Sequence, residues 1–183
     1  MVLGLCSDWK LDPEPLVGLP TDEAALRALG DEGVLALVCD STNVFVEGQT
    51  GSEGDLRKSL IEIIGKCTGR VAVASFASNV ARVATINRAA VETGRNPSMV
   101  GRSLWRSVDI ARECGYLEDI EPFVPESEIR FIPPDKVLMA VTGSQGEPRS
   151  ALSRIADGSH QSVSLEAGDT VIFSSREIPG NEN

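Results

Sequence analysis

The sequence predicts an α/β fold, a doubly wound, Rossmann-like and mostly parallel sheet with helices on both faces. Apolar runs of strand length alternate with amphipathic helical segments along most of the chain. The strand-length runs are apolar at consecutive positions, which is typical of strands buried on both faces. The turns between segments are short and favour right-handed crossovers within one sheet.

The N-terminal third contains a turn-rich stretch, one strand and two helical segments. Residues 11–33 are rich in proline and glycine and include one short helical patch, TDEAALRALGDEG. The apolar run VLALVCDSTN (34–43) follows and predicts a strand that ends at Asp40. Residues 52–69 then predict an amphipathic helix with one apolar face.

The rest of the chain repeats the order strand then helix. In sequence order the segments are RVAVASFAS (70–78, strand), NVARVATINRAAVETG (79–94, helix), NPSMVG (96–101, strand), SLWRSVDIARECGYL (103–117, helix), KVLMAVTGS (136–144, strand) and PRSALSRIADGS (148–159, helix). A proline-rich stretch at 121–135 interrupts the alternation. Residues 162–180 predict two final strands around the turn Glu166-Ala167-Gly168-Asp169.

Composition limits the classes of function. With 183 residues, of which 42% are hydrophobic, the chain can bury one core. Its net charge of −10 argues against a protein that holds nucleic acid by overall charge, although a local groove can still be basic. No apolar run is long enough for a membrane span, and the four cysteines have no CxxC spacing. A soluble, cytoplasmic protein with reduced cysteines is therefore expected.

Polar turns follow four of the predicted strands. They are DSTN (40–43), SFASN (75–79), TGSQGEP (142–148) and SSREIPGN (174–181). Ligands of such sheets bind beyond the carboxyl ends of the strands, where helix N-termini offer free N–H groups to a phosphate and small residues allow close approach. The candidate phosphate-binding residues are Ser41, Ser75, Ser78, Asn79, Arg82, Thr142, Gly143, Ser144, Gly146, Ser174 and Ser175.

A plainer interpretation competes at each turn. Ser, Thr, Asn and Asp after a strand often only cap the next helix, and Gly often only forms a turn. For one turn the capping interpretation is the better one, whereas four aligned turns favour a binding edge. Arg82, one turn inside its helix, is either a charged fork for phosphate or an ordinary solvated residue.

Other chemistry is sparse. No Walker-type Lys-Ser or Lys-Thr follows the glycines, and no GxGxxG is present. The single histidine, His160, lies in a polar DGSHQ loop and is expected to be solvated. One histidine without a cysteine cluster cannot complete a zinc site. Trp9 and Trp105 are expected in the core or in groove walls.

Six motifs give the chain a closer resemblance. SDWKLDPEP, LVCDSTN, FASNVARV, GRSLWR, VTGSQGEPRSALSRIA and GDTVIFSSREIPGNE, in this order, resemble the β-CASP region of ribonuclease J. Ribonucleases J are RNA-processing nucleases of the metallo-β-lactamase superfamily. The resemblance implies that RNA lies between the β-CASP and metallo-β-lactamase domains and that two zinc ions activate the attacking water.

The resemblance also implies roles for two aspartates. SDWK matches the family's GDWK or GDFK element, so Asp8 is expected to be a metal ligand, with Ser7 in place of the usual glycine. DSTN matches the first β-CASP motif, which makes Asp40 the acid that partners an active-site histidine beyond residue 183. The family's HxHxDH metal motif is not in this chain.

The expected organisation follows from these matches. Residues 1–33 correspond to a remnant of the metallo-β-lactamase domain and a linker, 34–176 to the β-CASP domain, and 177–183 to the start of the return. The function expected is the RNA-binding portion of a zinc-dependent ribonuclease, inactive without its metallo-β-lactamase partner domain. The alternative is a stand-alone nucleotide- or phosphate-binding module without chemistry.

Overall fold

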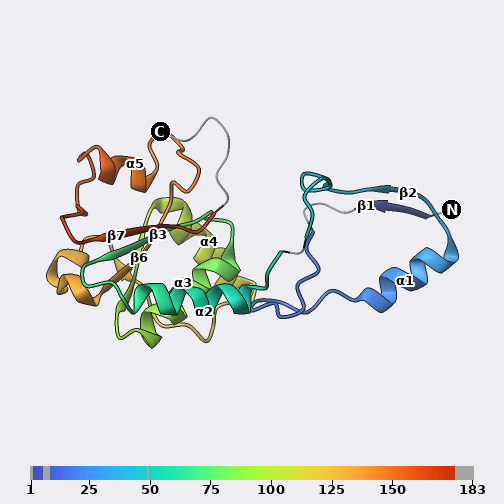
Figure 1. The fold of residues 1–183 in the computed structure, drawn as a ribbon, viewed down its shortest axis with the longest axis horizontal. Helices are drawn as coiled ribbons and strands as arrows, with labels where there is room; N and C mark the ends of the chain where they lie inside the picture. Colours follow the sequence, from blue (N-terminus) through green and yellow to red (C-terminus); the bar gives the residue numbers. More distant parts are fainter. Residues whose placement is uncertain (1, 6–8, 49, 176–183) are drawn as a thin grey trace.

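The computed structural model describes residues 2–5, 9–48 and 50–175 (Figure 1). Its main body is a five-stranded sheet in the order β5-β4-β6-β3-β7, in which every paired strand is parallel. The strands are β3 (Val71–Ala74), β4 (Asn96–Val100), β5 (Val124–Pro125), β6 (Val137–Val141) and β7 (Thr170–Phe173). The predicted α/β class is confirmed.

Helices cover both faces of this sheet, as a doubly wound fold requires. The helices are α2 (Glu53–Ile64), α3 (Val80–Glu92), α4 (Arg102–Glu113) and α5 (Ala151–Ala156), with short 3-10 turns η1 (Ile129–Phe131) and η2 (Pro134–Lys136). Val71 and Val73 of β3 pack into one core cluster with α2, α3 and α4, whereas Ala72 and Ala74 pack into another with α5 and η1. Figure 1 shows α5 on one side of the sheet and α2 and α3 on the other.

Side-chain caps determine where three of these helices begin. Ser52 and Asp55 form a reciprocal capping box at the start of α2. The Asn79 side chain caps α3, and the Ser150 hydroxyl accepts the Ser153 N–H, so that α5 begins at Ala151 rather than at the expected Pro148. The starts of these helices are therefore satisfied locally, by side chains at their own N-caps.

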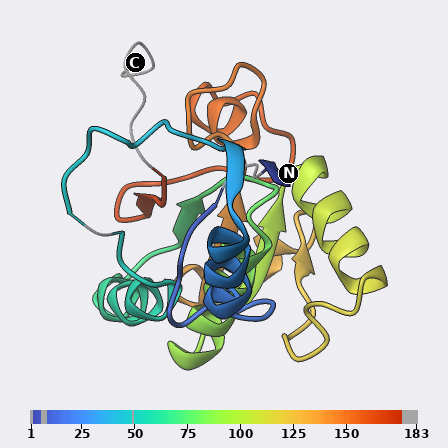
Figure 2. The same ribbon diagram turned by 90° about the vertical axis from the view of Figure 1, so that its right-hand side faces the viewer.

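The first predicted strand lies outside the main sheet. β2 (Val34–Val38) pairs in parallel with β1 (Val2–Leu5) in a separate two-stranded sheet, which lies with α1 (Glu23–Glu32) beside the main body (Figures 1 and 2). The expectation that 34–38 is a strand buried on both faces is wrong, because Leu35 and Leu37 are each 64% exposed. A continuous apolar run predicts a strand but does not specify what covers it.

The two-stranded sheet and α1 together form an arm, which a short linker containing Asp12 and Val17 attaches to the main body. Val17 packs against the core cluster to which α2, α3 and α4 contribute. The Glu53 N–H at the start of α2 donates to the Asp12 carboxylate at 3.2 Å, and Lys10 forms an ion pair with the same carboxylate. The N-terminal segment is thus bonded to the start of α2.

Two further expectations differ from the structure. Residues 162–165 are not a strand, so of the two strands expected around the turn at 166–169 the described residues contain one, β7. His160 is buried rather than solvated, with its side chain 2% exposed, because its Nδ1 accepts the backbone N–H groups of Ser162 and Val163. Trp105 packs edge-on against Phe123 at the core, as expected of a core residue.

Among the residues that the structure describes, none of the helices combines the length and apolarity that a membrane crossing requires.

Candidate functional site

The direction of the strand-to-helix connection changes between β3 and β6. These two strands are hydrogen-bonded neighbours. The helix after β3, α3, packs on one face of the sheet, whereas the helix after β6, α5, packs on the other. The loops 75–79 and 142–150 must therefore diverge, and such a switch of direction is where open α/β sheets bind ligands.

Two buried serine hydroxyls lie on these diverging loops. Ser75 directly follows β3 and is 1% exposed, while Ser144 follows β6 and is 6% exposed. Within the described residues neither hydroxyl has a hydrogen-bond partner. Buried polar atoms are normally satisfied, so this pair is unusual in a structured loop. Each hydroxyl is an unused donor, and a ligand oxygen could reach it only after the atoms that cover it move.

Glycines shape the loop that follows β6. Gly143 has φ 115° and Gly146 has φ 72°, both in the region that favours glycine. A Cβ at Gly143 would lie 2.9 Å from the Leu152 Cβ, so a side chain there would displace α5. Thr142 caps the same turn, since its hydroxyl accepts the Ala151 N–H at 3.1 Å. Thr142, Gly143 and Gly146 therefore determine the shape of the loop after β6.

The loop after β3 ends in an ordinary helix cap. The Asn79 Oδ1 accepts the Arg82 N–H at 3.0 Å, so the capping interpretation holds for Asn79. Ser78 is exposed beside it. The first residues of α3 point their backbone N–H groups toward this edge, as helix N-termini do.

The loop after β7 reaches the same edge. Ser174 continues the pairing with β3, since its N–H donates to the Ala74 carbonyl at 2.9 Å. The Ser175 hydroxyl donates to the Ser144 carbonyl at 2.9 Å. Three of the four predicted turns, those containing Ser75, Ser144 and Ser175, therefore meet at one edge of one sheet.

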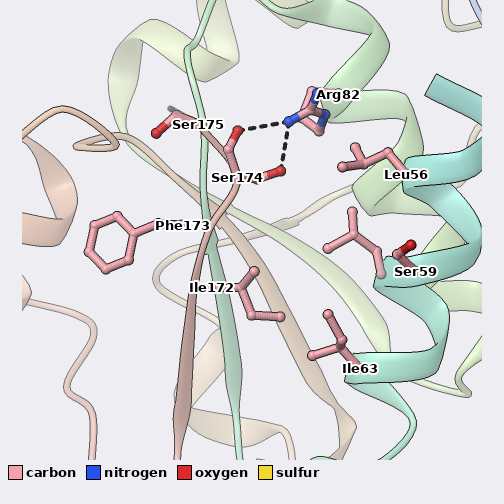
Figure 3. Close-up of a pocket in the computed structure, with 9 residues that line it drawn as sticks. Leu56, Ser59, Ile63, Arg82, Ile172, Phe173, Ser174 and Ser175 are labelled. Carbon is pink, nitrogen blue, oxygen red and sulfur yellow. Dashed lines mark hydrogen bonds between the residues drawn. The ribbon is translucent and has the colours of Figure 1, made fainter. Parts of the chain in front are cut away.

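Arg82 fits neither of the two interpretations of its sequence position. Its Nη2 and Nε donate to the two carboxylate oxygens of Glu53 at 2.8 and 3.2 Å. Its Nη1 donates to both the carbonyl and the hydroxyl of Ser174 at 2.7 Å (Figure 3). The guanidinium is thus not a solvated group, and its donors are already directed at Glu53 and Ser174.

The fourth turn, DSTN, is not on this edge, and the expectation of four aligned turns is wrong. Asp40 and Ser41 follow β2, which belongs to the two-stranded sheet. Hydrogen bonds from the Thr42 hydroxyl and N–H hold the pKa of Asp40 below its usual value, and the Asp40 carbonyl accepts from Trp9. The carboxylate stabilises its own turn.

Residues that could hold metal are not assembled in the described part of the chain. No group of three or more His, Cys, Asp or Glu side chains lies close enough there to hold an ion. Asp8, the expected metal ligand, lies outside the described residues. The described residues therefore do not by themselves fit the zinc pair that the resemblance implies.

Glu53 is a site residue that sequence reasoning missed. It lies in the first turn of α2, where an acidic residue is already explained by the helix dipole. Its partner Arg82 is 29 positions away, and no local pattern indicates that pairing. Gly101, at the end of β4, was also missed: a Cβ there would lie 2.9 Å from the Thr142 hydroxyl.

The sequence of the chain matches a known protein family over most of its length. A family model described as the ribonuclease J β-CASP domain matches residues 68–183. The chain is 50% identical over 175 residues to a ribonuclease J of Sinorhizobium meliloti, covering 96% of this chain and 31% of that protein. It is 48% identical to one from Mycolicibacterium smegmatis, over 96% of this chain and 32% of that protein.

A more distant relative gives the same picture. The ribonuclease J of Thermus thermophilus is 42% identical over 175 residues, covering 96% of this chain and 30% of that protein. The chain thus spans about a third of the length of these curated relatives.

Proposed function

The chain belongs to the ribonuclease J family, and from this premise we propose that its five-stranded β-CASP domain binds RNA by the phosphate backbone. The binding site is the edge formed by the loops after β3, β6 and β7. The observation that carries the proposal is the pair of buried, unpartnered hydroxyls of Ser75 and Ser144, which lie on loops that diverge at one edge of the sheet.

The chemistry of this edge suits a phosphodiester or a terminal phosphate. Phosphate oxygens are strong acceptors, and the edge contains the two serine hydroxyls and the partial positive charge of the α3 N-terminus, whose Val80 and Arg82 N–H groups are already hydrogen-bonded. These contacts are local. A net charge of −10 is therefore compatible with binding, because no broad basic surface is required.

RNA hydrolysis is proposed for the family's complete catalytic unit, in which zinc supplies an activated water. In that unit Asp8 would contribute a metal ligand, and Asp40 would support a histidine. The described residues do not assemble a metal site. We therefore propose that the 183-residue polypeptide binds RNA without cutting it.

Removing the two hydroxyls tests the binding role. Ser75→Ala with Ser144→Ala should weaken binding of a 5′-phosphorylated single-stranded RNA by about 1.5 kcal/mol or more, as expected for hydrogen bonds to a charged group. Because neither buried hydroxyl has a partner in the described residues, removing both relieves their desolvation cost, and the double variant should be at least as stable as the unmodified chain. Fluorescence anisotropy and urea unfolding measure the two quantities.

Ser98→Ala is the matched control. Ser98 is also a buried serine of this sheet, but it lies within β4 and donates to the Asn96 carbonyl. The Ser98→Ala variant should therefore leave RNA affinity unchanged. Unaltered affinity in the double variant would refute the proposed site.

The alternative is a module that binds free nucleotide or phosphate. The missing metal cluster in the described residues favours it, since such a module needs none. Competition separates the two: a nucleoside monophosphate that displaces RNA only at far higher concentration supports an RNA site, and equal affinity for both supports the module.

A further inference from the structure

The fork of Arg82 joins α2 to the end of β7. The two ends of the guanidinium bind different partners, Glu53 on one side and Ser174 on the other. Figure 3 shows the two bonds to Ser174. The side chains of Arg82 and Glu53 are each 14% exposed. A bidentate pair between a guanidinium and a carboxylate has a narrow geometry, so Glu53 determines the direction in which the remaining donors point.

Ser174 depends on this fork because it lies at the end of an edge strand. β7 pairs with β3 on one side, and within the described residues no strand pairs with its other side. A cavity of about 390 Å³ lies between α2 and the end of β7, and its lining includes Leu56, Ile63, Ile172, Arg82 and Ser174. Figure 3 shows Ile172 directed toward α2 and Phe173 directed away from it.

The position of Ser174 is transmitted to the candidate site by one further bond. Ser175, the next residue, donates its hydroxyl to the Ser144 carbonyl at 2.9 Å. Ser144 carries one of the two buried, unpartnered serine hydroxyls at this edge of the sheet. A shift of Ser174 would therefore move the contact that holds the loop after β6.

Glu53 is itself held from two directions. It is the first residue of α2, whose start is fixed by the capping box of Ser52 and Asp55. Its backbone N–H donates to Asp12 of the linker at 3.2 Å. The carboxylate thus extends from a fixed backbone position toward Arg82.

We propose that Glu53 is a positioning residue for the phosphate-binding edge. By holding the guanidinium of Arg82 in the fork that binds Ser174, it keeps the loop after β7 against the loop after β6. This inference rests on the proposed RNA-binding function of that edge. Neither Glu53 nor Arg82 needs to touch the RNA.

The proposal can be tested because positioning and simple electrostatics predict opposite changes in RNA affinity when Glu53 loses its charge. A carboxylate near an anion site repels the anion, and removing it also frees the positive charge of its partner. On charge alone, Glu53→Gln should bind RNA more tightly. If Glu53 acts by positioning, the same variant binds RNA more weakly.

The experiment measures affinity of the 183-residue chain for a 5′-phosphorylated single-stranded RNA. We expect Glu53→Gln to weaken binding about fivefold, the effect of one lost hydrogen-bonding contact. Arg82→Lys keeps the charge but loses the fork, and should weaken binding to a similar extent. The double variant should be no weaker than either single variant, because both break one linkage.

Glu92→Gln is the matched control. Glu92 forms an ion pair with Arg57, so this pair also joins α3 to α2, but it has no bond to β7. This variant should bind RNA within about twofold of the unmodified chain. In backbone NMR spectra, Glu53→Gln should shift the amide signals of Ser144 and Ser175, whereas Glu92→Gln should not.

The outcomes separate this inference from the function on which it rests. Equal or tighter RNA binding by Glu53→Gln overturns the positioning role while leaving the RNA site in place. If the unmodified chain does not bind RNA, the proposed function fails. In that case only the NMR comparison tests the linkage from Glu53 to the loop after β6. Unchanged Ser144 and Ser175 signals in Glu53→Gln would overturn that linkage.

Discussion

His160 illustrates how a single residue in a polar loop becomes structural. Its Nδ1 accepts two backbone N–H groups, so the neutral ring carries its proton on Nε2, which lies 3.9 Å from the Glu126 carboxylate. Burial lowers the pKa of His160 below its ordinary value of 6.5, against the opposing attraction of Glu126, while Arg154 adds a smaller lowering. Protonation of Nδ1 would remove the acceptor that holds this loop.

This burial predicts a pH dependence of stability. Below pH 6.5 the unfolded chain binds a proton at His160 that the folded chain does not. The free energy of unfolding should therefore fall as the pH decreases through 6.5 toward the lower folded pKa. His160→Asn removes this titration, so its unfolding free energy should vary less between about pH 7.5 and about pH 5. Urea unfolding across that range measures both slopes, and identical slopes would contradict the assignment.

The elements differ in how completely they are buried. Every residue of β3 and β6 is buried, and these strands lie inside the five-stranded sheet. Every residue of β2 is exposed, and α1 buries none of its residues. Local opening costs least where few apolar contacts are lost, so the main sheet and the arm should differ in stability.

Hydrogen exchange should show this difference directly. Amides of Val71–Ala74 and Val137–Val141 should exchange only through global unfolding, whereas those of Val34–Val38 should exchange much faster. Mass spectrometry of peptides from the three segments measures the rates. Equal protection of β2 and β3 in the isolated chain would show that another surface covers β2.

At the scale of the whole molecule, sequence predicted the sheet better than the site. β3 and β6 were predicted because a strand buried on both faces needs consecutive apolar residues. The same pattern placed β2 in the wrong sheet, because it does not identify the covering partner.

Sequence placed part of the candidate site for a similar reason. Ser75, Ser144 and Ser175 lie at one edge because parallel strands bring their carboxyl ends together, and their role in binding stays a prediction. Glu53 was not found, because its contact with Arg82 depends on how α2 and α3 pack. Tertiary contacts between polar residues leave no periodic signal in the sequence.

The central claim is that RNA phosphate binds where the loops after β3, β6 and β7 meet. Titration of the isotope-labelled chain with a 5′-phosphorylated single-stranded RNA, followed by amide NMR signals, tests it most directly. We predict saturable shifts concentrated in residues 75–79, 142–146 and 174–175, with β2 and α1 unaffected. Shifts confined to the two-stranded sheet and α1, or no shifts at RNA concentrations that saturate the anisotropy signal, would contradict the claim.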